Sequence, residues 1–380
     1  MDQNAAVLVE ESELGGRRPK GWARYLLFGL GVAWSLFQLW ATEVGTLDPL
    51  RLRAVHLAFA LALAFLAYPA RRGPKDRVPL SDWVLALLGA AGALYVVWDY
   101  YGITQLRGGI PSGRDVVMGT LTLLVLFVAS WRVVGPALPV IASVFVLYAL
   151  TGPKGLLPFT LPPWLQLHAG SQWGQLMGQL YTTAEGIWGV PLGVSATFVF
   201  LFVLFGALLE KAGAGHFFIQ VAYALLGHFR GGPAKAAVVA SALTGVVSGS
   251  SVSNVVTTGT FTIPLMKRVG YPPEKAGAVE VASSSNGQLM PPVMGAAAFI
   301  MAEFLGIPYN QLILIALLPA LLVYATLFIT VHLEALALGL KGVPRSELPP
   351  LGPILRSGAH YLLPLAYLLY ALVGLRLTPE

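Results

Sequence analysis

The sequence predicts an all-α protein that crosses a lipid bilayer many times. Of its 380 residues, 56% are hydrophobic and 11% are charged, and the mean hydropathy is +0.71. Soluble domains carry about 25% charged residues. A soluble protein of this length could not bury so many apolar side chains in its core. The apolar residues also fall into runs of about 20, the length of a helix that spans the hydrocarbon core. These two observations favour a polytopic membrane protein.

The charge pattern excludes several functional classes. The net charge is +6, but the basic residues lie in short loops between apolar runs, as membrane topology requires, so no nucleic-acid partner is expected. The absence of cysteine excludes disulfides, iron–sulfur clusters, cysteine-ligated zinc and thiol catalysis. The chain carries no Walker A lysine motif, no G-x-S-x-G elbow and no clustered metal ligands. We therefore expect neither an enzyme nor a bound organic cofactor.

Apolar runs of sufficient length mark the candidate spans. They cover residues 22–42, 53–70, 80–98, 114–132, 136–152, 191–209, 236–266, 276–302, 304–331 and 358–375. Residues 171–188 carry aromatic and apolar side chains at helical spacing, which predicts an amphipathic helix on the outer surface or, alternatively, an ordered loop. A short apolar helix is expected at the inner surface over 212–229. The chain thus divides near residue 152 into a front and a rear part.

Lysines and arginines set the orientation, because loops facing the cytoplasm are enriched in them. With a cytoplasmic N-terminus, 18 of the 24 basic residues fall on the inside, Arg71 and Arg72 among them, and six fall on the outside. This bias predicts that the N-terminus is cytoplasmic. Both flanks of 236–266 are basic, so both of its ends are expected on the inside.

The segment 236–266 is expected to enter the membrane and return on the same side. Of its 31 uncharged residues, 14 are Ser, Thr, Gly or Asn. A single helix of this length would measure about 46 Å, against about 30 Å for the hydrocarbon core. The central run Ser248-Gly249-Ser250-Ser251 favours a turn, because glycine and serine are poor residues for a helix interior. We therefore predict a re-entrant hairpin of two half-helices.

The tip of this hairpin offers the chemistry of an ion site. The first half-helix is expected to end near Val247 and Ser248 with unpaired carbonyls, and the second to begin near Ser253 and Asn254 with free N–H groups. Carbonyl and hydroxyl oxygens suit a hard cation such as sodium, and a helix N-terminus suits an anionic group. The alternative is close packing of helices through small residues, which needs no ligand.

A second interrupted helix is predicted over residues 274–303. Its centre holds three serines (283–285), Asn286, Gly287 and the pair Pro291-Pro292, which removes two backbone donors. We therefore expect a discontinuous transmembrane helix. Two successive breaks, each with an asparagine and several serines, predict facing halves of one cation site.

Glu280 lies inside this second segment and is a candidate proton-linked carboxylate. Because Lys275 is only five residues away, Glu280 is alternatively expected to pair with that lysine or to extend toward the inner surface. Glu303 and Glu334 lie near helix ends, where solvation is the simpler interpretation. His332 and Glu334 do not have the spacing of an H-E-x-x-H metal motif.

These segments resemble a known family of membrane transporters. The matching stretches are 241–271 (SALTGVVSGSSVSNVVTTGTFTIPLMKRVGY), 278–282 (AVEVA) and 288–306 (QLMPPVMGAAAFIMAEFLG). They are similar to the large membrane subunit of tripartite ATP-independent periplasmic (TRAP) transporters, in particular to the fused permeases that work with TAXI-type receptors. The resemblance covers most of 160–340, and the front helices then correspond to the small subunit, fused ahead of the large one.

The resemblance implies a sodium-driven carrier in the cytoplasmic (inner) membrane of a bacterium or archaeon, with elevator-type alternating access. It would take up a small organic anion, of the carboxylate type, from a periplasmic TAXI-type binding protein. Matched onto this chain, the sodium positions are Ser248, Gly249, Ser250, Ser253, Asn254, Ser285, Asn286 and Gly287. The residues expected beside the substrate are Thr257, Thr258, Gln288, Pro291 and Pro292.

The resemblance also implies an order of parts. These are a cytoplasmic segment (1–21), the front helices (22–152), a periplasmic-side loop with the amphipathic helix (153–190), a first inverted repeat (191–345) with hairpin 234–266 and broken helix 274–305, and the start of a further span (346–380). The family has two inverted repeats, whereas this sequence holds one. We therefore expect the remainder of the permease as a separate chain or a missing C-terminal half, since the charge bias disfavours two inverted copies. Alone, the chain is not expected to transport.

Other functions fit the same segments. In a non-transporting membrane scaffold, the motif would be inherited helix packing. A proton-coupled version of the same carrier would use Glu280 in place of sodium. A passive channel is a third alternative, although nothing in the sequence resembles a selectivity filter.

Overall fold

The computed structural model describes residues 16–45, 47–70, 73–157 and 159–377. Within these ranges the chain forms helices, turns and one isolated bridge between Thr151 and Leu157, with no β-strand, which confirms the all-α class. Seven described helical segments are long and apolar enough to cross a membrane: Trp22–Val44, Pro49–Ala67, Leu80–Trp98, Gly113–Val133, Val190–Ala212, Tyr309–Ala337 and Arg345–Gly374. Residues 1–15 of the predicted N-terminal segment, Arg71, Arg72 and residues 378–380 lie outside the described part.

The described part of the chain divides after Thr197 into a front unit (residues 16–197) and a rear unit (residues 198–377). This boundary differs from the predicted division near residue 152, because the segments α7, η2 and α8, within residues 173–194, contact the front helices. Two aromatic side chains explain the difference, since Tyr181 and Trp188 are completely buried in the front core. Their polar atoms are satisfied there: the Tyr181 hydroxyl donates to the Gly92 carbonyl (2.5 Å), and the Trp188 indole donates to the Tyr181 carbonyl (2.6 Å).

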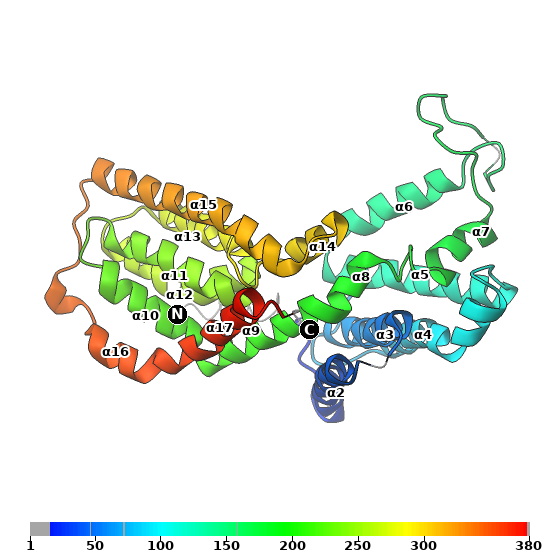
Figure 1. The fold of residues 1–380 in the computed structure, drawn as a ribbon, viewed down its shortest axis with the longest axis horizontal. Helices are drawn as coiled ribbons and strands as arrows, with labels where there is room; N and C mark the ends of the chain where they lie inside the picture. Colours follow the sequence, from blue (N-terminus) through cyan, green and yellow to red (C-terminus); the bar gives the residue numbers. More distant parts are fainter. Residues whose placement is uncertain (1–15, 46, 71–72, 158, 378–380) are drawn as a thin grey trace. The chain divides into compact units, whose positions relative to one another are not determined.

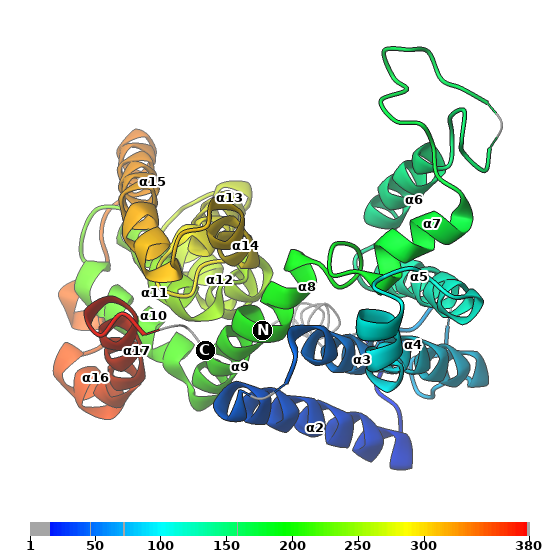
Figure 2. The same ribbon diagram turned by 45° about the vertical axis from the view of Figure 1, so that its right-hand side comes forward.

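The front unit contains five helices that match the predicted front spans: α2 (Trp22–Val44), α3 (Pro49–Ala67), α4 (Leu80–Trp98), α5 (Gly113–Val133) and α6 (Ala137–Ala149). Helix α3 packs against both α2 and α4, and α4 packs against α5 (Figure 2). Glycines permit the close approach. A Cβ on Gly89 would lie 3.0 Å from the Leu61 Cβ, and a Cβ on Gly92 would lie 2.3 Å from the Thr122 hydroxyl.

An ionic network closes one end of the α4–α5 pair. Asp82, in the first turn of α4, accepts hydrogen bonds from Arg17 (2.6 Å) and from Arg132 at the end of α5 (2.8 Å). Arg17 also donates to the Phe65 carbonyl (2.9 Å) and is buried. A buried carboxylate is tolerated when charged donors surround it, so this network holds three segments together.

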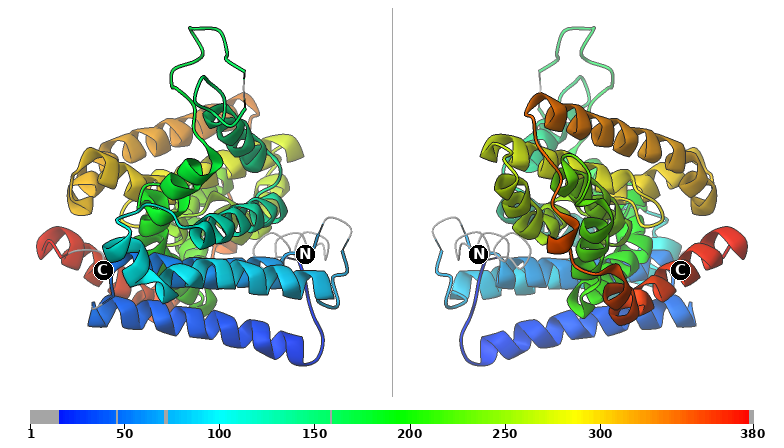
Figure 3. Two further views of the ribbon diagram at one scale, coloured as in Figure 1. Left: turned by 90° about the vertical axis from the view of Figure 1, so that its right-hand side faces the viewer. Right: turned by 90° about the vertical axis from the view of Figure 1, so that its left-hand side faces the viewer.

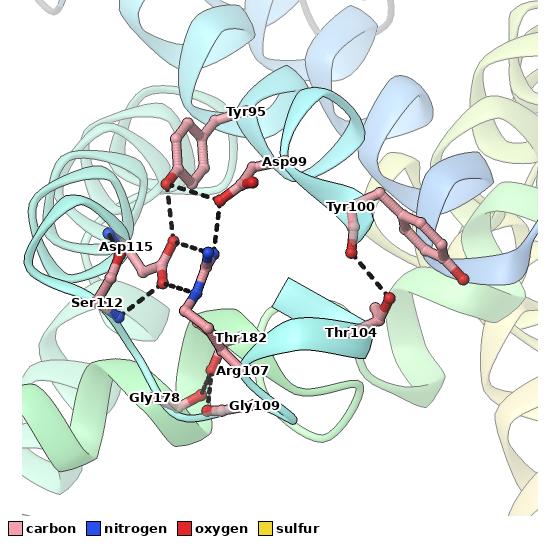
Figure 4. A network of polar contacts seen from close by, with 10 residues as sticks. All are labelled: Tyr95, Asp99, Tyr100, Thr104, Arg107, Gly109, Ser112, Asp115, Gly178 and Thr182. Atoms are coloured by element: carbon pink, nitrogen blue, oxygen red, sulfur yellow. Dashed lines mark hydrogen bonds and ion pairs between the residues drawn. The ribbon is translucent and has the colours of Figure 1, made fainter. Parts of the chain in front are cut away.

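A second network closes the opposite end of the same pair (Figure 4). Arg107 contacts Asp99 (2.5 Å) and Asp115 (3.1 Å), and the Tyr95 hydroxyl donates to Asp115 (2.8 Å). The hydrogen bond to Asp99 raises the pKa of the Arg107 guanidinium above its ordinary value. Since Asp99 follows Asp82 by 17 residues, the two networks lie about 26 Å apart along the helix, close to the thickness of the hydrocarbon core.

The amphipathic helix predicted over 171–188 is only partly present. Helix α7 (Trp173–Met177) continues as one turn of η2 (Gly178–Thr182), and the helical structure ends there. The Thr182 hydroxyl donates to the Gly109 carbonyl (2.6 Å), a contact shown in Figure 4. Trp188 therefore belongs to the protein core and not to a stripe facing the lipid. The chain then enters α8 (Val190–Val194) and η3 (Ser195–Val199).

The rear unit consists of helices joined by short turns. In chain order they are α9 (Phe200–Ala212), α10 (Ala214–Leu226), α11 (Gly232–Ser248), α12 (Ser251–Arg268), α13 (Pro273–Asn286), η4 (Gly287–Leu289), α14 (Ala296–Leu305), α15 (Tyr309–Ala337), η5 (Arg345–Glu347), α16 (Leu351–Gly358), η6 (Ala359–Tyr361), α17 (Leu362–Leu369) and η7 (Tyr370–Gly374). Helices α11, α12 and α13 pack against one another, and α15 covers α11 and α13 (Figures 1 and 3). The predicted inner-surface helix over 212–229 corresponds to α10.

Both predicted interruptions are present. The segment 236–266 forms two helices, α11 and α12, that pack side by side, and 274–305 is divided between α13 and α14. The span predicted over 358–375 stays helical from η6 through α17 to the end of η7 at Gly374. Local sequence explains the two breaks, because each coincides with glycine, serine or proline at the position where a continuous helix would be least stable.

Candidate functional site

The hairpin turn occupies two residues, Gly249 and Ser250. Gly249 ends α11 in the left-handed conformation (φ 57°), which glycine adopts without strain. Ser250 begins α12 as its N-cap, because its hydroxyl accepts a hydrogen bond from the Ser253 amide (3.3 Å). A Cβ on Gly249 would lie 2.3 Å from the Met294 carbonyl, so the turn rests directly on the break between α13 and α14.

The break between α13 and α14 is an ordered loop. Pro291, Pro292 and Gly295 are buried within it, and the Gly295 amide donates to the Gln288 carbonyl (2.8 Å). The Tyr309 hydroxyl lies within hydrogen-bonding distance of two carbonyls in the loop, those of Pro292 (2.7 Å) and Val293 (2.8 Å). Side chains and backbone thus satisfy groups that the missing helical turn leaves open, as buried polar groups require.

The hairpin and the break meet backbone to backbone at two glycines. A Cβ on Gly245 of α11 would lie 2.6 Å from the Gly287 Cα, and a Cβ on Gly287 would lie 2.9 Å from the Asn254 amide nitrogen. Asn254 is buried and joins the two half-helices: its Oδ1 accepts from Thr244 (2.6 Å), and its Nδ2 donates to the Ser241 carbonyl (2.9 Å). Oδ1 retains a second lone pair, so Asn254 remains able to ligate a cation.

The structure brings together some of the predicted sodium positions. Asn254 and Gly287 are in direct proximity, and Ser248, Gly249 and Ser250 form the tip that adjoins the break. On α13, however, Ser285 is exposed, whereas its neighbour Ser284 is buried and lies 3.4 Å from Ser241 of the hairpin. Helical geometry separates neighbouring side chains by about 100°, so only one of two adjacent serines is able to face the hairpin.

The predicted substrate-side residues occupy different environments. Gln288 is exposed and donates to the Ser251 hydroxyl (2.9 Å), which links the break to the start of α12. Pro291 and Pro292 are buried in the loop. Thr258 is completely buried and contacts Glu280, so it faces the interior between α12 and α13.

Two cavities adjoin the hairpin. The larger, of about 360 Å³, lies between the tip, the break and α9, and its polar lining comes from Ser248, Ser250 and Gln288. Its volume falls within the range of about 300–1,000 Å³ that is typical of small-molecule sites. The smaller cavity has about 10 Å³, and its lining combines apolar residues with the polar side chains of Glu210, Thr244, Ser248, Asn254 and Thr257. Such a volume accommodates about one water molecule.

Sequence reasoning missed Glu210. The carboxylate accepts hydrogen bonds from Thr257 (2.5 Å) and Ser253 (3.3 Å) on α12. One turn earlier on α9, a Cβ on Gly206 would lie 2.4 Å from the Val247 carbonyl, so α9 lies directly against the end of α11. The only available signal in the sequence was an acidic residue at the end of an apolar span, beside Lys211, which is equally typical of a solvated flank.

The predicted pairing of Glu280 with Lys275 is wrong. Lys275 forms an ion pair with Glu334 on α15, and both side chains are partly exposed. Glu280 is completely buried, and its partners are hydroxyl groups from three helices: Ser241, Thr258, Thr262 and Ser284. The partner of an acid in a helix therefore depends on the neighbouring helices and not on sequence distance alone.

Comparisons with known proteins agree on one family. The family described as "Tripartite ATP-independent periplasmic transporter, DctM component" matches residues 121–380. The chain is 31% identical over 147 residues to a C4-dicarboxylate TRAP transporter large permease protein of Pseudomonas aeruginosa, covering 39% of this chain and 34% of that protein. It is 38% identical over 91 residues to the protein of the same description from Rhodobacter capsulatus, covering 24% and 21%.

A relative named for a different solute shows a longer match. The chain is 26% identical over 198 residues to the ectoine TRAP transporter large permease protein of Halomonas elongata, covering 51% of this chain and 46% of that protein. The chain thus spans less than half of the length of each of these curated relatives.

Proposed function

Because the chain belongs to the DctM component family of TRAP transporters, we propose that it acts in the secondary uptake of a small organic anion across the inner membrane. It is a multi-pass membrane protein of a permease family and not an enzyme. The names of its relatives include carriers of C4-dicarboxylates and of ectoine, so a carboxylate-bearing solute is the substrate class we propose. A soluble periplasmic binding protein, of the TAXI type, would deliver it.

The observation that carries this proposal is the junction of the hairpin and the broken helix. Gly245, Gly287 and Asn254 join two helical interruptions beside a cavity of about 360 Å³. Interrupted helices that present backbone groups to a cavity are typical of substrate and ion sites in secondary transporters. Packing alone would not require a cavity with polar side chains in its lining at the same place.

We propose sodium as the coupling ion. The donor set fits a hard monovalent cation, because it consists of hydroxyl groups, the free lone pair of Asn254 Oδ1 and carbonyls at the end of α11. The candidate residues are Ser248, Gly249, Ser250, Ser253 and Asn254, with Asn286 and Gly287 from the break. A bound cation would supply positive charge that attracts an anionic substrate to the same cavity.

The proposed mechanism is elevator-type alternating access. In it, the hairpin and the broken helix move together as one body, which the close contacts of Gly245 and Gly249 with the break support. Both flanks of the hairpin would lie on the cytoplasmic side with the N-terminus, consistent with the basic residues at both ends of α11 and α12. The front helices would correspond to the small permease subunit.

Thermal unfolding of the purified chain in detergent tests sodium binding. Sodium and choline are compared at matched ionic strength, for wild type, Asn254→Ala and the control Thr326→Ala, whose hydroxyl bonds only within its own helix. A cation that binds only the folded state raises its stability by mass action. We expect a sodium-specific rise in wild type and the control, and its loss in Asn254→Ala. If all three proteins respond equally, the ion does not bind at this junction, and a scaffold role becomes the better interpretation.

A further inference from the structure

Glu280 lies at the centre of a cluster that the proposed sodium site does not use. Its Oε1 accepts hydrogen bonds from Thr258, Ser284 (3.0 Å) and Ser241 (3.4 Å), and its Oε2 accepts from Thr262. These partners come from both helices of the hairpin and from α13 itself. Glu280 is completely buried, and a Cβ on Gly259 of α12 would lie 3.1 Å from its Cγ.

The surroundings of Glu280 hold no neutralising cation among the described residues. Lys275, on the same helix, pairs with Glu334, and Lys235 at the start of α11 contacts His332 (3.0 Å). From α15, the titratable side chain facing this region is Tyr324, whose hydroxyl donates to the Ser283 carbonyl (3.0 Å). Helices α11 and α12 present only hydroxyl groups and Gly259 to the carboxylate. The charge of Glu280 is therefore balanced by hydrogen bonds alone.

The hydroxyl groups of Thr258, Thr262 and Ser284 contact the carboxylate oxygens directly. An ionised carboxylate accepts hydrogen bonds on both oxygens. Here three hydroxyls lie within reach of Oε1 and one within reach of Oε2. A proton on the same carboxyl requires one of the hydroxyls to accept instead. A buried carboxylate without a cation is costly in its charged form. The ionised and the protonated forms of Glu280 therefore both need hydrogen-bond partners.

Two of the hydroxyls have a second acceptor on their own helix. Thr258 lies 2.7 Å from the Asn254 carbonyl, and Thr262 lies 3.0 Å from the Thr258 carbonyl. When Glu280 is ionised, both donate to the carboxylate. When one oxygen of Glu280 carries a proton, the neighbouring threonine turns its hydrogen to the backbone carbonyl and accepts the proton of Glu280. Every donor is thus satisfied in both states.

We propose that Glu280 is a proton-binding site that reversibly takes up one proton from water. The carboxylate oxygen gains one O–H bond, the water-derived hydronium loses that proton, and the net charge of the cluster rises from −1 to zero. Uptake redirects one threonine hydrogen from the carboxylate to a carbonyl of α12. Proton binding would therefore alter the hydrogen bonds that join α12 of the hairpin to α13. This inference goes beyond the proposed function, because it concerns a site separate from the sodium positions and does not require sodium coupling.

Infrared spectroscopy of the full chain in detergent tests this proposal. The C=O stretching band of protonated carboxyl groups is recorded over the pH range in which the protein remains folded. The variant is Glu280→Gln, and the matched control is Glu274→Gln, an exposed acid in the first turn of the same helix. We expect wild type and Glu274→Gln to share a band that changes with pH, and we expect this band to be absent in Glu280→Gln. Identical titration in wild type and Glu280→Gln would overturn the proposal.

A second pair of variants keeps the test decisive if Glu280→Gln does not fold. Thr258→Val and Thr262→Val retain the side-chain shape and the carboxyl but each removes one partner. We expect each to shift the position of the titrating band, because its hydrogen bonding changes. A band that is unaffected by both variants, or one that does not change with pH, contradicts a proton site at Glu280.

The sodium experiment separates this proposal from the proposed function. Glu280→Gln is expected to keep the sodium-specific rise in unfolding temperature, because its contacts do not include the sodium positions. Loss of the sodium response in Asn254→Ala with an intact titrating band supports both proposals. If wild type shows the titrating band but no sodium response, sodium coupling is contradicted and the proton site at Glu280 is not.

Discussion

Thr257 on the second helix of the hairpin donates a hydrogen bond of 2.5 Å to Glu210 on α9. The same carboxylate accepts from Ser253, one turn earlier on α12. Glu210, which lies outside the hairpin, therefore binds the hydroxyls of Thr257 and Ser253 near the tip of the hairpin. The contact is permitted by Gly206, because any side chain there would collide with the Val247 carbonyl. It places a negative charge at the small cavity that Asn254 also lines.

Removal of this charge is expected to weaken cation binding without unfolding the protein. Glu210→Gln retains an oxygen that accepts from Thr257 but lacks the negative charge. We expect the apparent sodium affinity, from thermal unfolding at increasing sodium, to fall about fivefold, which corresponds to about 1 kcal/mol. Glu303→Gln, an exposed acid on α14, serves as the control and should leave the affinity unchanged. Equal affinities in both variants would exclude a role for Glu210 in ion binding.

A methyl group at Gly245 is expected to separate the hairpin from the broken helix. The Cβ of an alanine at position 245 would lie 2.6 Å from the Gly287 Cα. Backbone atoms cannot move aside as readily as the end of a flexible side chain. We expect Gly245→Ala to lower the free energy of unfolding by about 1–3 kcal/mol, through overpacking. The measurement is the unfolding temperature in detergent.

The matched control for this prediction is Gly277→Ala. Gly277 lies within α13, and no atom lies within 4 Å of its added Cβ. Since alanine favours a helix over glycine by up to about 1 kcal/mol, this variant should be neutral or slightly more stable. Similar losses in both variants would show that helix propensity, and not the junction, determines the effect.

The hydroxyl of Tyr309 is expected to stabilise the break between α13 and α14. Tyr309→Phe removes the donor for the Pro292 and Val293 carbonyls while retaining the buried ring. We expect a loss of about 1–3 kcal/mol, because a carbonyl is left unsatisfied in the interior. Thermal unfolding and the rate of proteolysis within 287–295 measure it. Tyr367→Phe, at an exposed tyrosine on α17, should change neither quantity.

The network at the end of α4 and α5 is expected to stabilise the front unit. Arg107→Ala leaves Asp115, whose side chain is completely buried, without its cation. We expect a loss of about 1–3 kcal/mol, below that of a fully buried pair because Arg107 is partly exposed. Arg268→Ala breaks an exposed pair with Glu347 and should cost less than about 1 kcal/mol. Unfolding temperatures of the two variants provide the comparison, and equal losses would contradict the predicted difference.

Much of the fold was predictable from the sequence because its signals are local. Run lengths located the spans, and the Ser248-Gly249-Ser250-Ser251 run located the hairpin turn to within one or two residues. Pro291 and Pro292 located the second break for the same reason, since proline removes a backbone donor wherever it occurs. The unit boundary after Thr197 has no such local signal, because nothing in the nearby sequence shows that Tyr181 and Trp188 are buried among helices that precede them by up to about 130 residues.

In the candidate site, the helix interruptions follow from local sequence, whereas the side-chain contacts follow from tertiary packing. The two helix interruptions and the polar residues beside them follow from the sequence, because glycine and proline act locally on the backbone. The packing of the helices decides that Ser284 faces the hairpin and Ser285 does not, that Glu280 contacts hydroxyls and not Lys275, and that Glu210 reaches Thr257. Those contacts join helices that are far apart in the chain. Which face of each helix is buried depends on how all its neighbouring helices pack.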